Sequence, residues 1–101
     1  MSEYFSSTLA RIVERAEHVA VTVIGPEAEA VDQSAAWPAL GIRALAAEGL
    51  TALTVPTHLG GMGQGLLGIA AVTEAIGRAC ASTAMCYGMH CVGSAGIAAK
   101  A

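Results

Sequence analysis

The sequence contains few aromatic residues and few basic ones. Aromatic side chains make up 4% of its 101 residues although 54% are hydrophobic, so small aliphatic side chains supply most of the apolar surface. The net charge is −3, and the five lysines and arginines are scattered, with no basic run. Nucleic-acid binding needs a clustered basic face. We therefore expect one small domain that does not bind nucleic acid.

Cysteine is also scarce. Cys80, Cys86 and Cys91 all lie in the last quarter of the chain, and an odd number so placed does not describe a disulfide framework. The N-terminus has no basic stretch followed by an apolar core, and Glu3 and Glu14 disfavour a secretory or mitochondrial leader. The reducing cytoplasm is therefore the expected location.

The second half of the chain almost lacks charge. From Gly49 to Ala101 only Glu74, Arg78 and Lys100 are charged. Helices that are apolar or small all round are usually buried from all sides. This half therefore predicts a fragment, a subunit of a larger assembly, or a tight homo-oligomer. A membrane span is the alternative for the last segment, but its serine, glycine, cysteine and histidine content is only weakly hydrophobic.

Hydrophobic spacing predicts four helical segments and an all-α fold. Ser6 or Ser7 caps the first segment, and Gly25-Pro26 stops it or kinks it sharply, with one further helical turn over 26–32. Its apolar positions share one face: Leu9, Ile12, Val13, Ala16, Val19 and Val23. The second segment begins near Pro38 and ends at Gly49, a suitable C′ residue.

The third segment is expected over about 66–79 and the fourth from Ser82, a plausible N-cap, to the chain end. An apolar stripe is predicted on the third segment: Leu66, Ile69, Ala70, Thr73, Ile76 and Cys80. The stretch Leu50–Pro56 is compatible with a short strand. Glu74 and Arg78 are spaced as a helical ion pair.

Glycine is abundant between the second and third segments. Gly63, Gly65 and Gly68 follow the spacing G-x-G-x-x-G. A dinucleotide site also needs a second strand and an acidic residue about 20 residues onward, and no Asp or Glu follows Glu74. A P-loop would need a Lys-Ser or Lys-Thr pair. The better interpretation is a connection that turns tightly and lets the third helix approach its neighbours.

Cys86 and His90 are four residues apart and share a helix face. A metal site normally needs three or four converging ligands, which the spacing does not supply. A cysteine nucleophile with His90 as its base would need an orienting third group, and none is marked. Small buried thiols and one satisfied histidine are the preferred interpretation, with no metal ligand and no catalytic residue in the chain.

Taken in order, the motifs resemble the N-terminal helical domain of the acyl-CoA dehydrogenases. Asp32 precedes the pair Trp37-Pro38, a helix ends in "EGL", a "VP…GGMG" loop follows, and Glu74 lies in the next helix before "ASTAMCYGMH". Each piece alone is weak, but the ordered set is specific. The resemblance covers about residues 5–101, so we assign 1–101 to this antiparallel α-helical domain with its glycine-rich connecting loop.

The resemblance implies a flavoprotein of which this chain is only a part. Members of the family add a β-barrel domain and a C-terminal helical bundle, neither of which is in this chain. FAD takes hydride from the β-carbon of an acyl-CoA while a glutamate of the C-terminal domain removes the α-proton. The resemblance therefore implies no flavin-binding residue here, and Glu74 lies in the wrong domain to be that base.

The resemblance also implies one site. In relatives the start of the fourth helix helps to line the acyl-chain pocket, and the matching residues here are Ser82, Thr83, Cys86, Met89 and His90. Plain helix packing is the alternative for each. Two other functions stay open: a flavin-dependent monooxygenase of the same fold, and a non-catalytic helical protein that oligomerises or binds partners.

Overall fold

The structure is a computed structural model that describes residues 6–34 and 37–100. Within these ranges every regular element is helical, which confirms the predicted all-α fold. The elements are α1 (Ser7–Val19), the π-helix η2 (Ala20–Ile24), α2 (Gly25–Ser34), α3 (Ala39–Ala47), the 3₁₀ turns η3 (Leu50–Ala52) and η4 (Thr57–Leu59), α4 (Leu66–Gly77) and α5 (Ala81–Lys100). The domain was predicted to span 1–101, and its last residue, Ala101, lies outside the described residues.

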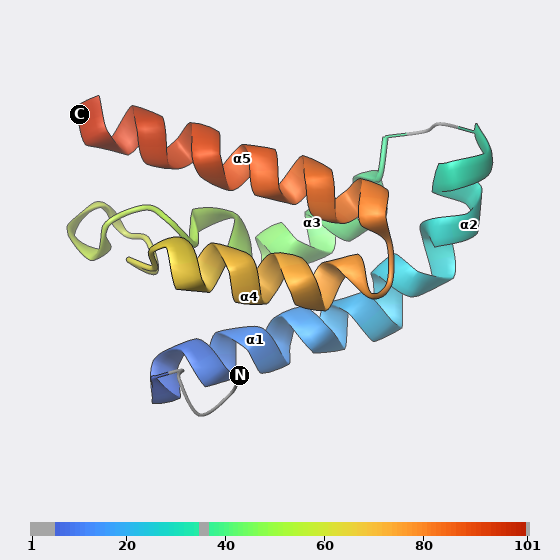
Figure 1. The fold of residues 1–101 in the computed structure, drawn as a ribbon, viewed down its shortest axis with the longest axis horizontal. Helices are drawn as coiled ribbons and strands as arrows, with labels where there is room; N and C mark the ends of the chain where they lie inside the picture. The colour runs from blue at the N-terminus through green and yellow to red at the C-terminus, as the bar shows by residue number, and fades with distance from the viewer. Residues whose placement is uncertain (1–5, 35–36, 101) are drawn as a thin grey trace.

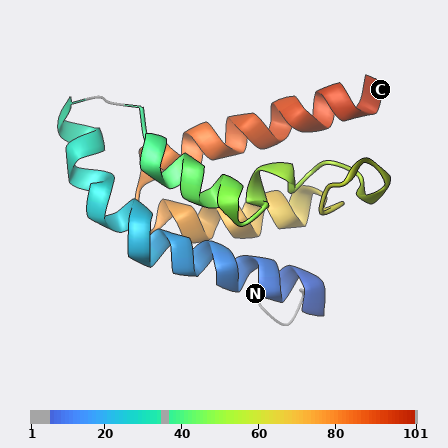
Figure 2. The ribbon, with the colours of Figure 1, turned by 180° about the vertical axis from the view of Figure 1, so that it is seen from behind.

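Helix α4 lies in the middle of the molecule and packs against α1 on one side and α5 on the other. Seen from behind, α3 covers the same central space between α1 and α5 (Figure 2). Helices α4 and α5 run antiparallel, and α2 turns away from α1 toward the beginning of α5 (Figure 1). The largest fully buried side chains come from all these parts of the chain and form one core: Tyr87, Ile24, Leu45, Leu50, Leu53, Ile76 and Val72.

Helix α1 begins as its sequence predicts. The Ser6 hydroxyl accepts a hydrogen bond from the backbone N–H of Leu9 at 3.0 Å, which satisfies one of the free donors at the helix start. The residues buried by α1 are Leu9, Ile12, Ala16 and Val19, four members of the predicted apolar face. The amphipathic pattern therefore identified both the start and the inner face of this helix.

The junction at Gly25-Pro26 was predicted either to stop the helix or to kink it sharply, and the second outcome occurs, because α2 turns away from α1 there (Figure 1). The helix does not stop there: it widens into the π-helix Ala20–Ile24, in which the N–H of Gly25 donates to the carbonyl of Ala20. Pro26 has no N–H to continue the α-helical ladder, and a π-turn is a common way to absorb such a break. The expected single turn is instead α2, which has 10 residues.

Glu27 then fixes α2 to α3. Its carboxylate oxygen accepts a hydrogen bond from the backbone N–H of Gly41 at 2.8 Å. Pro38, at the N-cap position of α3, supplies no side-chain hydrogen bond, so a carboxylate from another helix satisfies a free donor at this positive helix end. At the other end Gly49 has φ 76°, which confirms it as the C′ glycine.

The short strand with which Leu50–Pro56 was compatible does not form. Residues Leu50–Ala52 form a 3₁₀ turn, and the N–H groups of Leu53 and Val55 donate to carbonyls three residues back. Leu50 and Leu53 are both fully buried, and their spacing of three places them on the same side of a helical turn. A strand would point them to opposite faces.

The apolar stripe predicted on α4 is not the side that packs into the core. The residues that α4 buries are Gly68, Ala71, Val72, Ala75 and Ile76, and of the predicted stripe on α4 itself only Ile76 is among them. The helix has apolar residues on both sides, so periodicity did not distinguish the side that packs inward. The smaller side chains allow α4 to approach its neighbours closely, which decides which side becomes the core.

Candidate functional site

Helix α5 carries all five candidate residues. Its buried side is formed by Thr83, Ala84, Tyr87 and Cys91. The carbonyl of Cys80 accepts the first helical hydrogen bond, from the N–H of Ala84 at 3.1 Å, so Cys80 and not Ser82 holds the N-cap position. The predicted N-cap at Ser82 is therefore wrong by two residues. The Ser82 side chain does not cap α5 and instead contacts Asp32.

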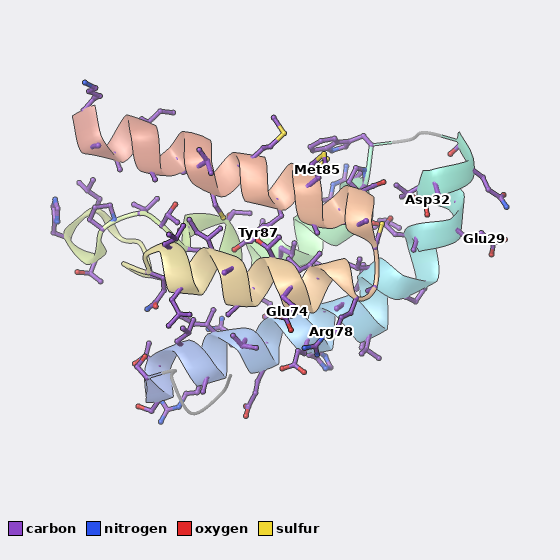
Figure 3. The ribbon with its side chains drawn as sticks, viewed as in Figure 1. Glu29, Asp32, Glu74, Arg78, Met85 and Tyr87 are labelled. Atoms are coloured by element: carbon purple, nitrogen blue, oxygen red, sulfur yellow. The ribbon has the colours of Figure 1, made fainter. Side chains whose placement is uncertain are left out.

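The five candidate residues differ in exposure and in their hydrogen bonds. Ser82 is exposed, and its hydroxyl lies 3.2 Å from a carboxylate oxygen of Asp32, which Figure 3 shows on α2 beside the start of α5. Thr83 is fully buried, and its hydroxyl has no hydrogen-bond partner. Cys86 is half-buried, whereas His90 is exposed and Met89 is 71% exposed. Because Ser82, Cys86 and His90 are four residues apart, they lie in one row along α5.

Three side-chain hydrogen bonds attach α5 to the turn that follows α3. The Tyr87 hydroxyl donates to the carbonyl of Leu50 at 2.6 Å, and Nε2 of His90 lies 2.6 Å from the carbonyl oxygen of Thr51. The Thr54 hydroxyl donates in return to the carbonyl of Cys91 at 2.8 Å. We call Tyr87, His90 and Thr54 the η3 clasp. It holds this irregular segment firmly against the candidate row.

Burial changes the acidity of two groups on the inner side of α5. The pKa of Tyr87 is raised well above its usual 10.0, mainly because burial penalises the phenolate and also because Cys91 lies close to it. Burial likewise raises the pKa of Cys91, and the hydrogen bond with Tyr87 opposes this. A buried thiol held neutral is a poor nucleophile, so this pair is structural rather than reactive.

The surroundings of Cys86 and His90 bear on the alternatives of a metal site and a cysteine nucleophile. No group of three or more His, Cys, Asp and Glu side chains in these ranges is placed to hold a metal ion. The His90 ring is hydrogen-bonded to Thr51, and over residues 6–34 and 37–100 no hydrogen bond joins it to Cys86. Cys80 and Cys91 are buried as the sequence predicts for small thiols, whereas Cys86 is half-buried, and within the described residues the hydrogen-bond contacts of the His90 ring involve Nε2 alone.

The glycine loop is built around its own backbone. The N–H groups of Met62, Gly63 and Gln64 donate to the carbonyls of Ala52, Val55 and Leu53 at 3.0, 2.8 and 2.9 Å. A phosphate-binding loop needs such N–H groups free to point at the ligand. These three donors are occupied by the loop's own backbone and do not point at a ligand. The tight-turn interpretation of the glycines agrees with this arrangement.

An apolar groove that the sequence analysis missed runs between α4 and α5. It has a volume of about 550 Å³. Its lining includes Ile69, Ala70 and Thr73 from α4 and Met85, Gly88 and Val92 from α5. The Thr73 hydroxyl is buried there without a hydrogen-bond partner. Three of these residues, Ile69, Ala70 and Thr73, belong to the stripe predicted on the third segment, so the sequence signal was present although it did not indicate a groove.

The ion pair beside this groove contributes little to stability. Arg78 and Glu74 form the predicted pair on α4, with their side chains 67% and 50% exposed (Figure 3). Exposed pairs at this spacing contribute only about 0.3–0.5 kcal/mol. No helix among residues 6–34 and 37–100 meets the length and hydropathy needed to cross a bilayer.

Comparison with known proteins decides the family. The model of the acyl-CoA dehydrogenase N-terminal domain matches residues 6–100. The chain belongs to this family. The match covers nearly the whole sequence and confirms the resemblance drawn from the ordered motifs.

Two curated relatives agree with this assignment. The chain is 35% identical over 74 residues to cyclohex-1-ene-1-carbonyl-CoA dehydrogenase of Syntrophus aciditrophicus (strain SB), which covers 73% of this chain and 18% of the relative. It is 34% identical over 64 residues to the probable acyl-CoA dehydrogenase YngJ of Bacillus subtilis (strain 168), covering 63% of this chain and 17% of the relative. The chain thus spans less than a fifth of either relative's length. No solved structure gives a significant match.

Proposed function

We propose that this acyl-CoA dehydrogenase N-terminal domain works as part of an FAD-dependent enzyme that dehydrogenates an acyl-CoA thioester between its α and β carbons. The chain contributes one wall of the acyl pocket and part of a subunit interface. FAD, when bound elsewhere in such an assembly, supplies the hydride acceptor. The residues of this chain bind, orient and exclude water, and none is assigned to proton or hydride transfer.

The observation that carries the proposal is the uncovered apolar surface of α4 and α5. Six large side chains on these helices are 44–81% exposed: Leu66, Leu67, Met85, Met89, Val92 and Ile97. Three of them, Met85, Met89 and Val92, line one apolar groove, and exposed apolar surface of this kind marks an interaction or binding site. Further domains of a flavoprotein, or a neighbouring subunit, would cover it.

We assign the acyl wall to the row on α5. Ser82, Cys86 and His90 lie along one side of this helix, and Met89 is adjacent to them on its exposed side. Thr83 is the exception, because its side chain is fully buried within this chain and supports the wall from beneath. Small or sulfur-containing side chains at this position leave room for an apolar chain.

The same surface is compatible with two other functions. A flavin-dependent monooxygenase of this fold would use the row on α5 for a substrate other than an acyl-CoA. A non-catalytic helical protein would use the exposed sides of α4 and α5 to bind copies of itself or a partner. The family match and both relatives' names favour the dehydrogenase.

The free thiols Cys80, Cys86 and Cys91 suit the reducing cytoplasm, where we place the protein.

Native mass spectrometry and an absorbance spectrum of the protein purified from its own source test the proposal. A longer polypeptide or partner chain with a flavin absorbance band supports it, and reduction of that band by an acyl-CoA separates a dehydrogenase from a monooxygenase. A colourless assembly that contains only 101-residue chains would remove the enzyme and favour the interaction protein.

A further inference from the structure

The hydrogen bond of His90 determines which ring nitrogen carries a proton. Nε2 lies 2.6 Å from the carbonyl oxygen of Thr51, and a carbonyl oxygen can only accept. The proton must therefore be on Nε2, and Nδ1 of the neutral ring keeps its lone pair. The hydroxyl of Ser94 is 3.4 Å from the same Nε2 and cannot donate to it in this state.

The carbonyl that fixes this tautomer is itself held in place. Tyr87 binds the carbonyl of Leu50, the residue before Thr51, and Thr54 binds the carbonyl of Cys91, the residue after His90. Leu50 is fully buried. These contacts keep the backbone of η3 at a constant distance from α5, so the Nε2 hydrogen bond does not depend on one flexible contact.

His90 offers the strongest uncommitted acceptor among the five candidate residues. The Ser82 hydroxyl is already paired with Asp32, and the Thr83 hydroxyl is buried. Cys86 and Met89 present sulfur atoms, which are weak acceptors. In the described part of the chain no hydrogen bond engages Nδ1 of His90, which is an exposed residue.

We propose that Nδ1 of His90 accepts a hydrogen bond from the bound acyl group, so that the substrate is an acyl-CoA whose acyl chain carries a hydroxyl. The inference rests on the proposed function for the position of α5 beside the acyl chain. His90 is a specificity-determining residue in this scheme. A hydroxyl on the acyl chain pairs with Nδ1, whereas an unsubstituted chain that covers His90 removes this acceptor from water and leaves it without a partner.

The tautomer is tested on the 101-residue chain without flavin. Two-bond and three-bond proton–nitrogen correlations on ¹⁵N-labelled protein distinguish the two neutral tautomers of a histidine ring. We expect His90 to be protonated on Nε2, with its signal assigned by loss in His90→Gln. A ring protonated on Nδ1 would overturn the inference, whatever the flavin content of the natural protein.

Specificity is tested on the flavin-containing protein purified as above. The probes are length-matched pairs, from butanoyl-CoA to octanoyl-CoA, with and without a terminal hydroxyl. His90→Leu should lower kcat/KM for the hydroxylated member roughly threefold to tenfold more than for its plain partner. His90→Gln, whose amide can donate to Thr51 and also accept, should restore the preference, and His18→Leu on α1 is the matched control.

The outcomes separate the two proposals. An equal loss for both probes in His90→Leu would assign the contact to the shared CoA portion or to packing, and would overturn the hydroxyacyl inference while leaving the dehydrogenase standing. A protein that binds no flavin in its natural assembly would remove the proposed function and this inference together.

Discussion

Tyr87 places its hydroxyl in a mainly apolar core, and one backbone carbonyl accepts its hydrogen bond. The side chain is fully buried, and the 2.6 Å bond to Leu50 supplies the partner that a buried hydroxyl requires. Because ionisation would leave a buried phenolate, the folded state keeps Tyr87 protonated far into alkaline pH. This residue therefore contributes to both the geometry and the pH dependence of the fold.

Stability should fall in alkaline solution through Tyr87. Its folded-state pKa is raised above the unfolded value of 10.0, so its contribution is complete below that pH and is lost as pH rises further. Each additional pH unit should remove about 1.4 kcal/mol from the free energy of unfolding. Urea unfolding of wild type and Tyr87→Phe between pH 8 and about 11 measures the difference. Equal slopes above pH 10 would show that Tyr87 is not buried in solution.

Gly61 is the glycine of the connecting loop with the least space. A Cβ there would overlap the carbonyl oxygen and Cβ of Val55, and backbone cannot move aside as a flexible side chain does. Gly61→Ala should therefore cost about 1–3 kcal/mol or more by overpacking. Gly65→Ala is the matched control, because nothing lies within 4 Å of its Cβ position, and it should cost less than about 1 kcal/mol. Thermal unfolding compares the two variants, and similar melting temperatures would contradict the loop geometry.

At the scale of elements, α5 is weakened by its own glycines. Gly93 lies in its interior, with nothing within 4 Å of the Cβ position. Glycine in a helix interior costs roughly 0.5–1 kcal/mol relative to alanine. Gly93→Ala should therefore stabilise the chain by about that amount in denaturant unfolding.

Gly41 on α3 provides the opposite case. A Cβ there would lie 2.8 Å from the Glu27 carboxylate and 3.0 Å from Ile24. Gly41→Ala should therefore destabilise the fold, because the added methyl group would disturb the hydrogen bond from the N–H of Gly41 on α3 to the Glu27 carboxylate on α2. If Gly93→Ala also destabilised the protein, the exposed side of α5 would have to be in contact with other protein in solution.

Helix identity and helix packing differ in how far the sequence determines them. The start of α1 at Ser6 and the C′ position at Gly49 were predicted because capping depends on residues close in sequence. The 3₁₀ turn at Leu50–Ala52 and the start of α5 at Cys80 were not predicted. Both depend on contacts from elsewhere in the fold: burial of Leu50 and Leu53 for the first, and the placement of α5 against α2 for the second.

On the scale of the whole molecule, the chain has more apolar surface than its own fold covers. Met85, Met89 and Val92 are all at least 65% exposed and lie on one side of α5, beside the groove against α4. Figure 3 shows Met85 on the outer side of the helix, whereas Tyr87 lies on its inner side. The apolar surface that the fold leaves uncovered is the basis of both the proposed subunit interface and the proposed acyl wall.

A charge in the groove should suppress association without unfolding the chain. Val92 is 65% exposed, so Val92→Glu should change the free energy of unfolding by less than about 0.5 kcal/mol. It should reduce hydrophobic-dye binding and oligomer mass in analytical ultracentrifugation. Val21→Glu, at a 76% exposed position on η2, is the matched control. A wild-type chain that is monomeric and binds no dye would contradict the uncovered surface.

The family, the helical class and the glycine connection were evident from the order of short motifs, because capping, turn chemistry and hydrophobic spacing are encoded over a few residues. The side of α4 that forms the core, the occupied N–H groups of the glycine loop and the tautomer of His90 were not. Each depends on atoms distant in sequence: Thr51 lies 39 residues from His90, and its carbonyl approaches the ring only when η3 packs on α5. Local patterns specify elements, whereas packing specifies which faces meet and which polar atoms stay free.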